Sequence, residues 1–260
     1  MSTILTLTDA RLTIGTATLL DHISLSIDAG ERIALIGPNG AGKSSLLRIL
    51  SGELRPSRGD VSLFGRPLSG YAPAELAERR AVLSQQIAVA FPFRVAEIVA
   101  MGGRGTLIPD AIINDALGRV GLTGLADRIV TTLSGGEQQR AHIARVLVQM
   151  TFGERSDTRG LIFLDEPTAS LDLRHQLDLA KIVSGCAERG LAVVSILHDL
   201  NLVPLFADRV IALNHGRIAD DGPVDATITE SMMRRIFNVA GAVGRTPPDR
   251  MPFVLPQSAD

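Results

Sequence analysis

The sequence of 260 residues has few cysteines and few aromatic residues. Cys186 is the single cysteine, tryptophan is absent, and aromatic residues make up 3% of the chain. One thiol cannot form an internal disulfide, so nothing indicates an oxidising compartment. Because no motif surrounds Cys186, we expect it to be a buried structural thiol.

Long apolar runs and an excess of one charge are also missing. No stretch approaches the roughly 20 apolar residues that cross a bilayer, and the start, MSTILTLTDA, lacks the basic region of a signal peptide. We therefore expect the chain in the cytoplasm, and at a membrane only through a partner. The net charge of -2 supplies no field that would attract nucleic acid, so we expect no nucleic-acid partner.

The pattern of short β-rich runs alternating with helical segments predicts an α/β fold with a mainly parallel sheet. The predicted strands are 24–27, 32–36, 61–64, 81–83, 161–164, 191–197, 209–213 and 217–219. The predicted helices are 44–50, 110–120, 134–150, a segment around 177–187, and 231–237. Strand signals disappear over 95–129, which indicates a helical insertion, while 151–160 is predicted as a loop.

A glycine-rich loop follows the predicted strand 32–36. The sequence GPNGAGKS at 37–44 fits the phosphate-binding pattern G-x-x-x-x-G-K-[ST], and a helix is predicted directly after it. Lys43 would reach the β and γ phosphates of a nucleotide, and the Ser44 hydroxyl would hold Mg²⁺. The alternative, an exposed glycine-rich turn, is much weaker between a strand and a helix. The predicted nucleotide-binding residues are Gly37, Pro38, Asn39, Gly40, Ala41, Gly42, Lys43, Ser44 and Ser45.

Two carboxylates end the predicted strand 161–164, at the sheet edge where α/β proteins bind ligands. Side chains alternate along a strand, so Asp165 and Glu166 should point in different directions and have different tasks. We expect Asp165 to hold Mg²⁺ and Glu166 to act as general base toward the attacking water. A pair of surface acids is the alternative.

Two further polar residues follow predicted strands. Gln85 is suited to Mg²⁺ or to the attacking water, although a glutamine there alone is most often a solvated loop residue. His198 follows strand 191–197 and is placed to hydrogen-bond the γ-phosphate. The other histidines are expected to be structural, namely His22, His142, His175 and His215.

The segment LSGGEQQR at 133–140 opens a predicted helix, with Ser134 and Glu137 as a capping box. Gly135 and Gly136 cost helix stability at this point, which indicates the close approach of a ligand or of another backbone.

These motifs, in this order, resemble the ABC ATPase family over about residues 1–220. LSGGE matches the family signature, Gln85 the Q-loop, Asp165 and Glu166 the Walker B motif, Asp172 in ASLD the D-loop, and His198 the switch histidine. The resemblance implies an ABC-type P-loop fold, with an N-terminal antiparallel β subdomain and a helical signature subdomain. It implies an ABC ATPase domain at 1–222, its helical subdomain at about 86–150, and a C-terminal extension at 223–260.

The resemblance also implies ATP and Mg²⁺ as cofactors and a head-to-tail homodimer. The signature residues of one subunit would cap the γ-phosphate held by the other, and these are Ser134, Gly135, Gly136 and Glu137. Catalysis would fall to Glu166, His198 and Gln85, and Mg²⁺ would be held by Ser44, Gln85 and Asp165. Hydrolysis would open the dimer, and the helical insertion would pass this motion to transmembrane permease subunits.

One departure from the family concerns adenine. The family usually stacks an aromatic residue on the base, but this chain has no aromatic residue before Phe64. The contact is then expected near Arg11 to Ile14, with weak discrimination between ATP and GTP.

Local segments resemble the ATPases of bacterial haem importers: SQQ at 84–86, VAFPF at 89–93, GEQQRAHIARVL at 136–147, the insertion at 151–160, LDLRHQ at 171–176 and PFVLP at 252–256. This resemblance implies a peripheral motor subunit at the cytoplasmic face of the inner membrane, served indirectly by a periplasmic substrate-binding protein. Importers of ferric siderophores or cobalamin are the alternative cargo class. A soluble ABC ATPase would share the catalytic residues, whereas a non-hydrolysing scaffold would be expected to lose Glu166 or Lys43.

Overall fold

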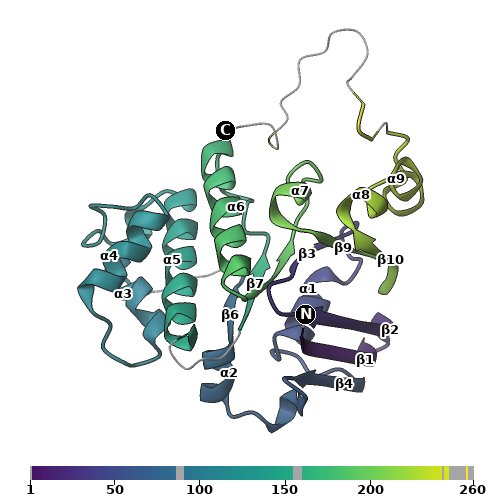
Figure 1. The fold of residues 1–260 in the computed structure, drawn as a ribbon, viewed down its shortest axis with the longest axis horizontal. Helices are drawn as coiled ribbons and strands as arrows, with labels where there is room; N and C mark the ends of the chain where they lie inside the picture. Colours follow the sequence, from purple (N-terminus) through teal and green to yellow (C-terminus); the bar gives the residue numbers. More distant parts are fainter. Residues whose placement is uncertain (1, 86–90, 155–159, 242, 246–255, 257–260) are drawn as a thin grey trace.

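The computed structural model describes residues 2–85, 91–154, 160–241, 243–245 and 256. Within these ranges the chain forms two sheets, with helices packed around the larger one (Figure 1). The smaller sheet is antiparallel, with strand order β2-β1-β4-β5, and the larger has the order β10-β9-β3-β8-β7-β6. The predicted α/β class is therefore confirmed.

The antiparallel sheet begins with a long hairpin, β1 (Thr3–Ile14) and β2 (Ala17–Asp28). It is completed by β4 (Arg58–Leu63) and β5 (Arg66–Pro67). Only 24–27 and 61–64 are predicted as strands here, so β1 and most of β2 were missed. The reason is a break in the alternation, since Asp9 and His22 take left-handed backbone angles, with φ of 44° and 53°, where the β1–β2 register shifts.

The central sheet is built on four parallel strands with buried residues on both faces. These are β3 (Arg32–Ile36), β8 (Ala192–Ile196), β7 (Leu161–Asp165) and β6 (Arg80–Leu83), all predicted to within a residue or two. On the other side of β3 lies β9 (Arg209–Asn214), which is parallel to it, and beyond β9 lies β10 (Arg217–Pro223), which is antiparallel to β9. The carboxyl ends of β3, β6, β7 and β8 consequently share one edge.

The turn between β9 and β10 joins the two sheets to the phosphate loop. The Asp21 amide of β2 donates to the Gly216 carbonyl at 2.8 Å, and the Gly216 amide donates to the Ala41 carbonyl at 3.1 Å. A methyl group at Gly216 would stand 2.6 Å from the Leu19 carbonyl oxygen, so only glycine allows this approach.

Helices cover the central sheet and form the helical part at the left of Figure 1. That part contains α3 (Val95–Ala100), α4 (Asp110–Arg119) and the long α5 (Gly135–Glu154). The remaining helices are α1 (Lys43–Leu50), α2 (Pro73–Arg79), α6 (Leu173–Glu188), α7 (Val203–Phe206), α8 (Val224–Thr227) and α9 (Glu230–Phe237). No helix in the described part of the chain is both long and apolar enough to cross a membrane.

The long helix α5 extends into the predicted loop 151–160, and the C-terminal α9 packs on the main core. The predicted loop at 151–160 was wrong at its start, because α5 continues to Glu154 and the Thr151 hydroxyl donates to the Leu147 carbonyl at 3.0 Å. The rest of that loop lies largely outside the described residues, as do 86–90 and 252–255 of the segments that resemble haem importers. The C-terminal α9 packs on the main core through Met232 and Ile236, and Cys186 is buried as expected.

Candidate active site

The phosphate loop between β3 and α1 depends on two glycines that touch neighbouring strands. A methyl group at Gly37 (φ 142°) would stand 2.2 Å from the Leu213 carbonyl oxygen, and one at Gly42 (φ 101°) would stand 2.9 Å from that of Leu19. Gly40 has open space around it and is exposed with Asn39 at the tip of the loop. The loop is thus fixed at its two ends and accessible in the middle.

Lys43, the first residue of α1, is buried inside this loop. Its Nζ donates to the Gly37 carbonyl at 2.8 Å and to the Pro38 carbonyl at 3.0 Å. Burial lowers the pKa of Lys43, and the nearby Glu166 and Asp165 carboxylates partly oppose this effect. The ammonium group therefore lies inside the loop, where the charges of the two acids act on it.

Asp165 is the last residue of β7, and its side chain is buried. Burial and the Glu166 charge raise the pKa of Asp165, against a hydrogen bond from Ser44 that lowers it. Its Oδ1 has no hydrogen-bond partner among the described residues. An unpaired buried carboxylate oxygen beside a serine hydroxyl fits the oxygen ligands that Mg²⁺ requires.

Glu166, the next residue, contacts side chains that follow β6 and β8. Its Oε2 accepts from Gln85 Nε2 at 2.8 Å, and its Oε1 lies 2.6 Å from His198 Nε2. Three residues predicted from strand ends are therefore in direct contact. The backbone of Glu166 is left-handed, with φ of 50°, a conformation that costs a non-glycine residue about 1–3 kcal/mol.

The signature residues lie at the exposed start of α5. The predicted capping box is present, because the Ser134 amide donates to Glu137 Oε2 at 2.8 Å and the Glu137 amide donates to Ser134 Oγ at 3.4 Å. A methyl group at Gly136 would stand 2.8 Å from the Ser170 carbonyl oxygen, whereas one at Gly135 would meet nothing within 4 Å. The close approach of another backbone therefore explains the glycine at 136. Gly135 has no such neighbour and is exposed to solvent.

Asp172 caps the start of α6. Its Oδ1 accepts from the His175 amide at 3.0 Å and lies 2.7 Å from His175 Nδ1. These interactions with His175, the main-chain one first, lower the pKa of Asp172. The residue is exposed, and the charge of Arg140 on α5 acts on it.

Two glutamines next to these motifs were missed by sequence reasoning. Gln139 Nε2 donates to the Pro167 carbonyl at 2.7 Å and to the Glu166 carbonyl at 3.3 Å. Gln176 Nε2 donates to the Leu171 and Thr168 carbonyls at 3.1 and 3.3 Å. The available signal was that Gln139 follows Gly136 by three positions and so lies on the same helix face.

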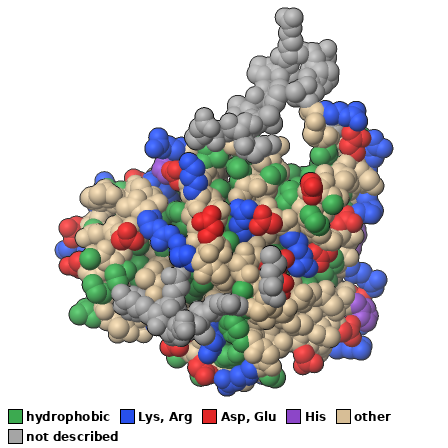
Figure 2. All heavy atoms as spheres, viewed as in Figure 1, with side chains coloured by type: hydrophobic (Ala, Val, Ile, Leu, Met, Phe, Trp, Pro, Cys, Tyr) green, Lys and Arg blue, Asp and Glu red, His purple; other side chains and the backbone are tan. Residues whose placement is uncertain are grey.

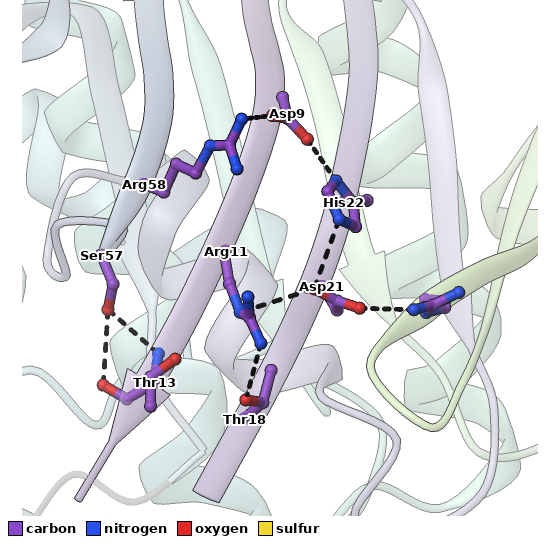
Figure 3. A network of polar contacts seen from close by, with 9 residues as sticks. Asp9, Arg11, Thr13, Thr18, Asp21, His22, Ser57 and Arg58 are labelled. Atoms are coloured by element: carbon purple, nitrogen blue, oxygen red, sulfur yellow. Dashed lines mark hydrogen bonds and ion pairs between the residues drawn. The ribbon is translucent and has the colours of Figure 1, made fainter. Parts of the chain in front are cut away.

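The region expected to meet adenine is dominated by an ion-pair network on the β1–β2 hairpin (Figure 3). Arg11 Nε lies 3.5 Å from Asp21 Oδ1, and its Nη2 donates to Thr18 Oγ1 at 3.5 Å. Asp21 also pairs with Arg217 at 2.5 Å. Because the Arg11 guanidinium is engaged, the freest apolar surface between Arg11 and Ile14 is that of Ile14, which is 58% exposed at the end of β1.

Charge on the molecular surface is mixed. On the face shown in Figure 2, basic and acidic side chains alternate over the helical part and the sheets. Exposed ion pairs are present in the described part of the chain, such as Arg94 with Asp127 and Arg66 with Glu75. Exposed pairs of this kind contribute little to stability, about 0–1 kcal/mol each.

Residues 20–169 match the family model described as ABC transporter. The chain belongs to the ABC transporter family, and it is a nucleotide-binding protein with the ATPase activity of that family's ATP-binding proteins.

Three relatives that carry the same description are similar to this chain over almost its whole length. The hemin import ATP-binding protein HmuV of Rhodopseudomonas palustris (strain BisB18) is 56% identical over 96% of this chain and 94% of that protein. The protein of the same description from Bradyrhizobium diazoefficiens is 53% identical over 94% of this chain and 91% of that protein. The one from Agrobacterium fabrum is 43% identical over 92% and 93%, respectively.

Solved structures confirm the expected P-loop fold. CbiO1 from Clostridium perfringens, described as part of the ABC transporter complex cbiONQ, matches with a TM-score of 0.72 and 28% identity over 90% of this chain and 94% of that chain. A bacterial Atm1-family ABC exporter with ATP bound matches with a TM-score of 0.76 and 25% identity, over 90% of this chain and 40% of that longer chain.

Proposed function

We propose that this protein is the ATP-hydrolysing motor subunit of a bacterial haem importer. The observation that supports it best is the similarity to hemin import ATP-binding proteins, which extends over nearly the full length of both chains. The site supports the motor role, since a phosphate loop and two acids with separate surroundings meet at one sheet edge. We assign the ABC domain to 1–222, its helical subdomain to about 86–150, and the extension to 223–260.

The loop amides and Lys43 would bind the β and γ phosphates of ATP. On binding, Lys43 would exchange the Gly37 and Pro38 carbonyls for phosphate oxygens, which bear a full charge and accept stronger hydrogen bonds. Ser44, Gln85 and Asp165 would hold Mg²⁺, which when bound supplies positive charge against the charge that develops on the phosphates.

Glu166 would act as general base. The oxygen of a water attacks the γ-phosphorus, the bond to the bridging oxygen of ADP breaks, and the water proton passes to the Glu166 carboxylate. Gln85 and His198 hold that carboxylate from two sides, which fixes its direction before the nucleotide arrives. His198 would then turn toward the γ-phosphate as a hydrogen-bond donor.

A second copy of the chain would complete each site. Ser134, Gly135, Gly136 and Glu137 would cap the γ-phosphate of the partner subunit, with Asp172 beside them. The exposure of Ser134, Gly135 and Asp172 supports this arrangement. The dimer would sit on transmembrane permease subunits at the cytoplasmic face of the bacterial inner membrane, and a periplasmic binding protein would act on it only indirectly.

We expect weak discrimination between ATP and GTP. An aliphatic surface such as Ile14 contacts either purine but reads none of the exocyclic groups that distinguish them, because discrimination requires paired polar groups. In competition kinetics, GTP should inhibit ATP hydrolysis with a constant within about threefold of the KM for ATP. Failure of GTP to compete at tenfold excess would contradict the expectation.

Haem import can be tested by reconstitution with the cognate permease in liposomes. Haem on its binding protein should stimulate ATP turnover, whereas a ferric siderophore or cobalamin should leave the basal rate unchanged. The matched control is the same preparation carrying Glu166→Gln, which should respond to none of them. Stimulation by either other cargo would disprove haem import, and failure to copurify with any permease would instead support a soluble ATPase.

A further inference from the structure

The main chain of Glu166 is held by a side chain from a different part of the sequence. Gln139 precedes the two residues it binds by 27 and 28 positions, and its carboxamide donates to the carbonyls of Glu166 and Pro167 at 3.3 and 2.7 Å. Gln139 is half-buried on α5. One amide group thus connects the helix that begins with the signature to the residue that follows β7.

Glu166 needs such support because its backbone lies in the left-handed region, with φ of 50°. A residue with a Cβ atom stays there only where its surroundings hold it. Gln85 and His198 bind the two oxygens of the carboxylate, whereas Gln139 binds main-chain carbonyls. A rotation of the Glu166 main chain would swing the carboxylate away from the strand edge, and Gln139 binds the carbonyls on either side of Pro167 Cα.

The first turn of α5 also touches the same turn farther along. Gly136 lies so close to Ser170 that an added methyl group would stand 2.8 Å from its carbonyl oxygen. On the other side, Gln176 of α6 binds the carbonyls of Thr168 and Leu171. The turn from Glu166 to Asp172 is therefore held between two helices by two glutamine amides.

We propose that Gln139 is a positioning residue for ATP hydrolysis, which fixes the Glu166 main chain and thereby the direction of the general base. The inference rests on the base role assigned to Glu166 under the proposed function. The signature residues that would face the second copy begin the same helix. Gln139 therefore also connects the general base of one nucleotide site to the signature residues that would contact the γ-phosphate of the other.

The test compares two replacements of Gln139 in the full-length protein reconstituted with its permease. Gln139→Met keeps the length but cannot donate, and it should lower kcat about tenfold with the KM for ATP within about twofold of wild type. Gln139→Lys restores a hydrogen-bond donor and should recover kcat to within about threefold of wild type. Lys43, whose ammonium group donates to two main-chain carbonyls in the phosphate loop, shows that a lysine can make such a pair of bonds.

Gln149→Met is the matched control. Gln149 lies near the other end of α5. Its Nε2 likewise donates two hydrogen bonds, to the carbonyls of Ala77 and Arg80 at 3.0 and 2.9 Å. Gln149→Met and Gln139→Met should both lower the melting temperature, because each removes partly buried hydrogen bonds, but Gln149→Met should leave kcat within about twofold of wild type. A purely structural role for Gln139 would make the two variants indistinguishable.

Combination with Glu166→Gln gives a second readout. If Gln139 acts only through the base, Gln139→Met should leave the residual turnover of Glu166→Gln within about twofold. The inference is overturned if Gln139→Met keeps wild-type kcat, if Gln139→Lys is as slow as Gln139→Met, or if the two losses multiply. The ATP turnover of the wild type is measured first, because an inactive wild type would contradict the proposed function and not the role of Gln139.

Discussion

Replacing Glu166 by glutamine should lower kcat by at least about 100-fold, because general-base catalysis contributes factors of about 10²–10⁴. The amide keeps the shape of the carboxylate but cannot accept the water proton. Binding should survive, since Lys43 and the loop amides are unchanged. Phosphate release under steady state gives the rate, and light scattering with nucleotide analysis should find a stable dimer that retains ATP.

The control for this variant is Glu188→Gln, which changes an exposed carboxylate at the end of α6. It should leave both turnover and oligomeric state as in the wild type. Unchanged turnover in Glu166→Gln would remove Glu166 from the base role. Slow turnover without retained ATP would instead mean that the substitution damages the nucleotide site itself.

Lys43→Met should weaken ATP binding about 10- to 100-fold, since a charge-assisted hydrogen bond is worth about 1.5–3 kcal/mol. The thioether fills a similar volume but offers no donor to a phosphate. The Gly37 and Pro38 carbonyls also lose their donor, so the melting temperature should fall as well. Titration with a fluorescent ATP analogue measures the affinity.

Lys181 provides the matched control, because it is the only other lysine in the chain and is exposed on α6. Lys181→Met removes the same charge far from the loop and should leave ATP affinity within about twofold of wild type, as expected for a screened surface charge. Equal affinities in Lys43→Met and Lys181→Met would contradict the phosphate-binding role of Lys43.

The sequence could predict the residues at strand ends because hydrophobic runs locate the strands and the parallel order brings their ends together. Asp165, Glu166, Gln85 and His198 follow this logic, and Gln85 and His198 each contact the Glu166 carboxylate. The capping box at Ser134 was predictable for a similar reason, since it depends on a spacing of three residues.

Other features depend on contacts that no local pattern encodes. The bonds from Gln139 to the turn after β7 need the packed arrangement of α5 against the sheet, and the left-handed angle of Glu166 is stable only with that packing. The register shift at Asp9 and His22 concealed β1, because a single extra residue reverses which side chains are buried. The continuation of α5 beyond Met150 was missed because threonine and glycine usually favour a helix end.

The bonding of Gly216 to both Asp21 and Ala41 has a mechanical consequence. The antiparallel sheet cannot tilt relative to the phosphate loop unless these main-chain bonds break, so the hairpin and the loop behave as a rigid body. With adenine at the hairpin, as we propose, the span between the base and phosphate ends of a bound nucleotide would be set by the fold, and bending during the cycle would occur elsewhere in the chain.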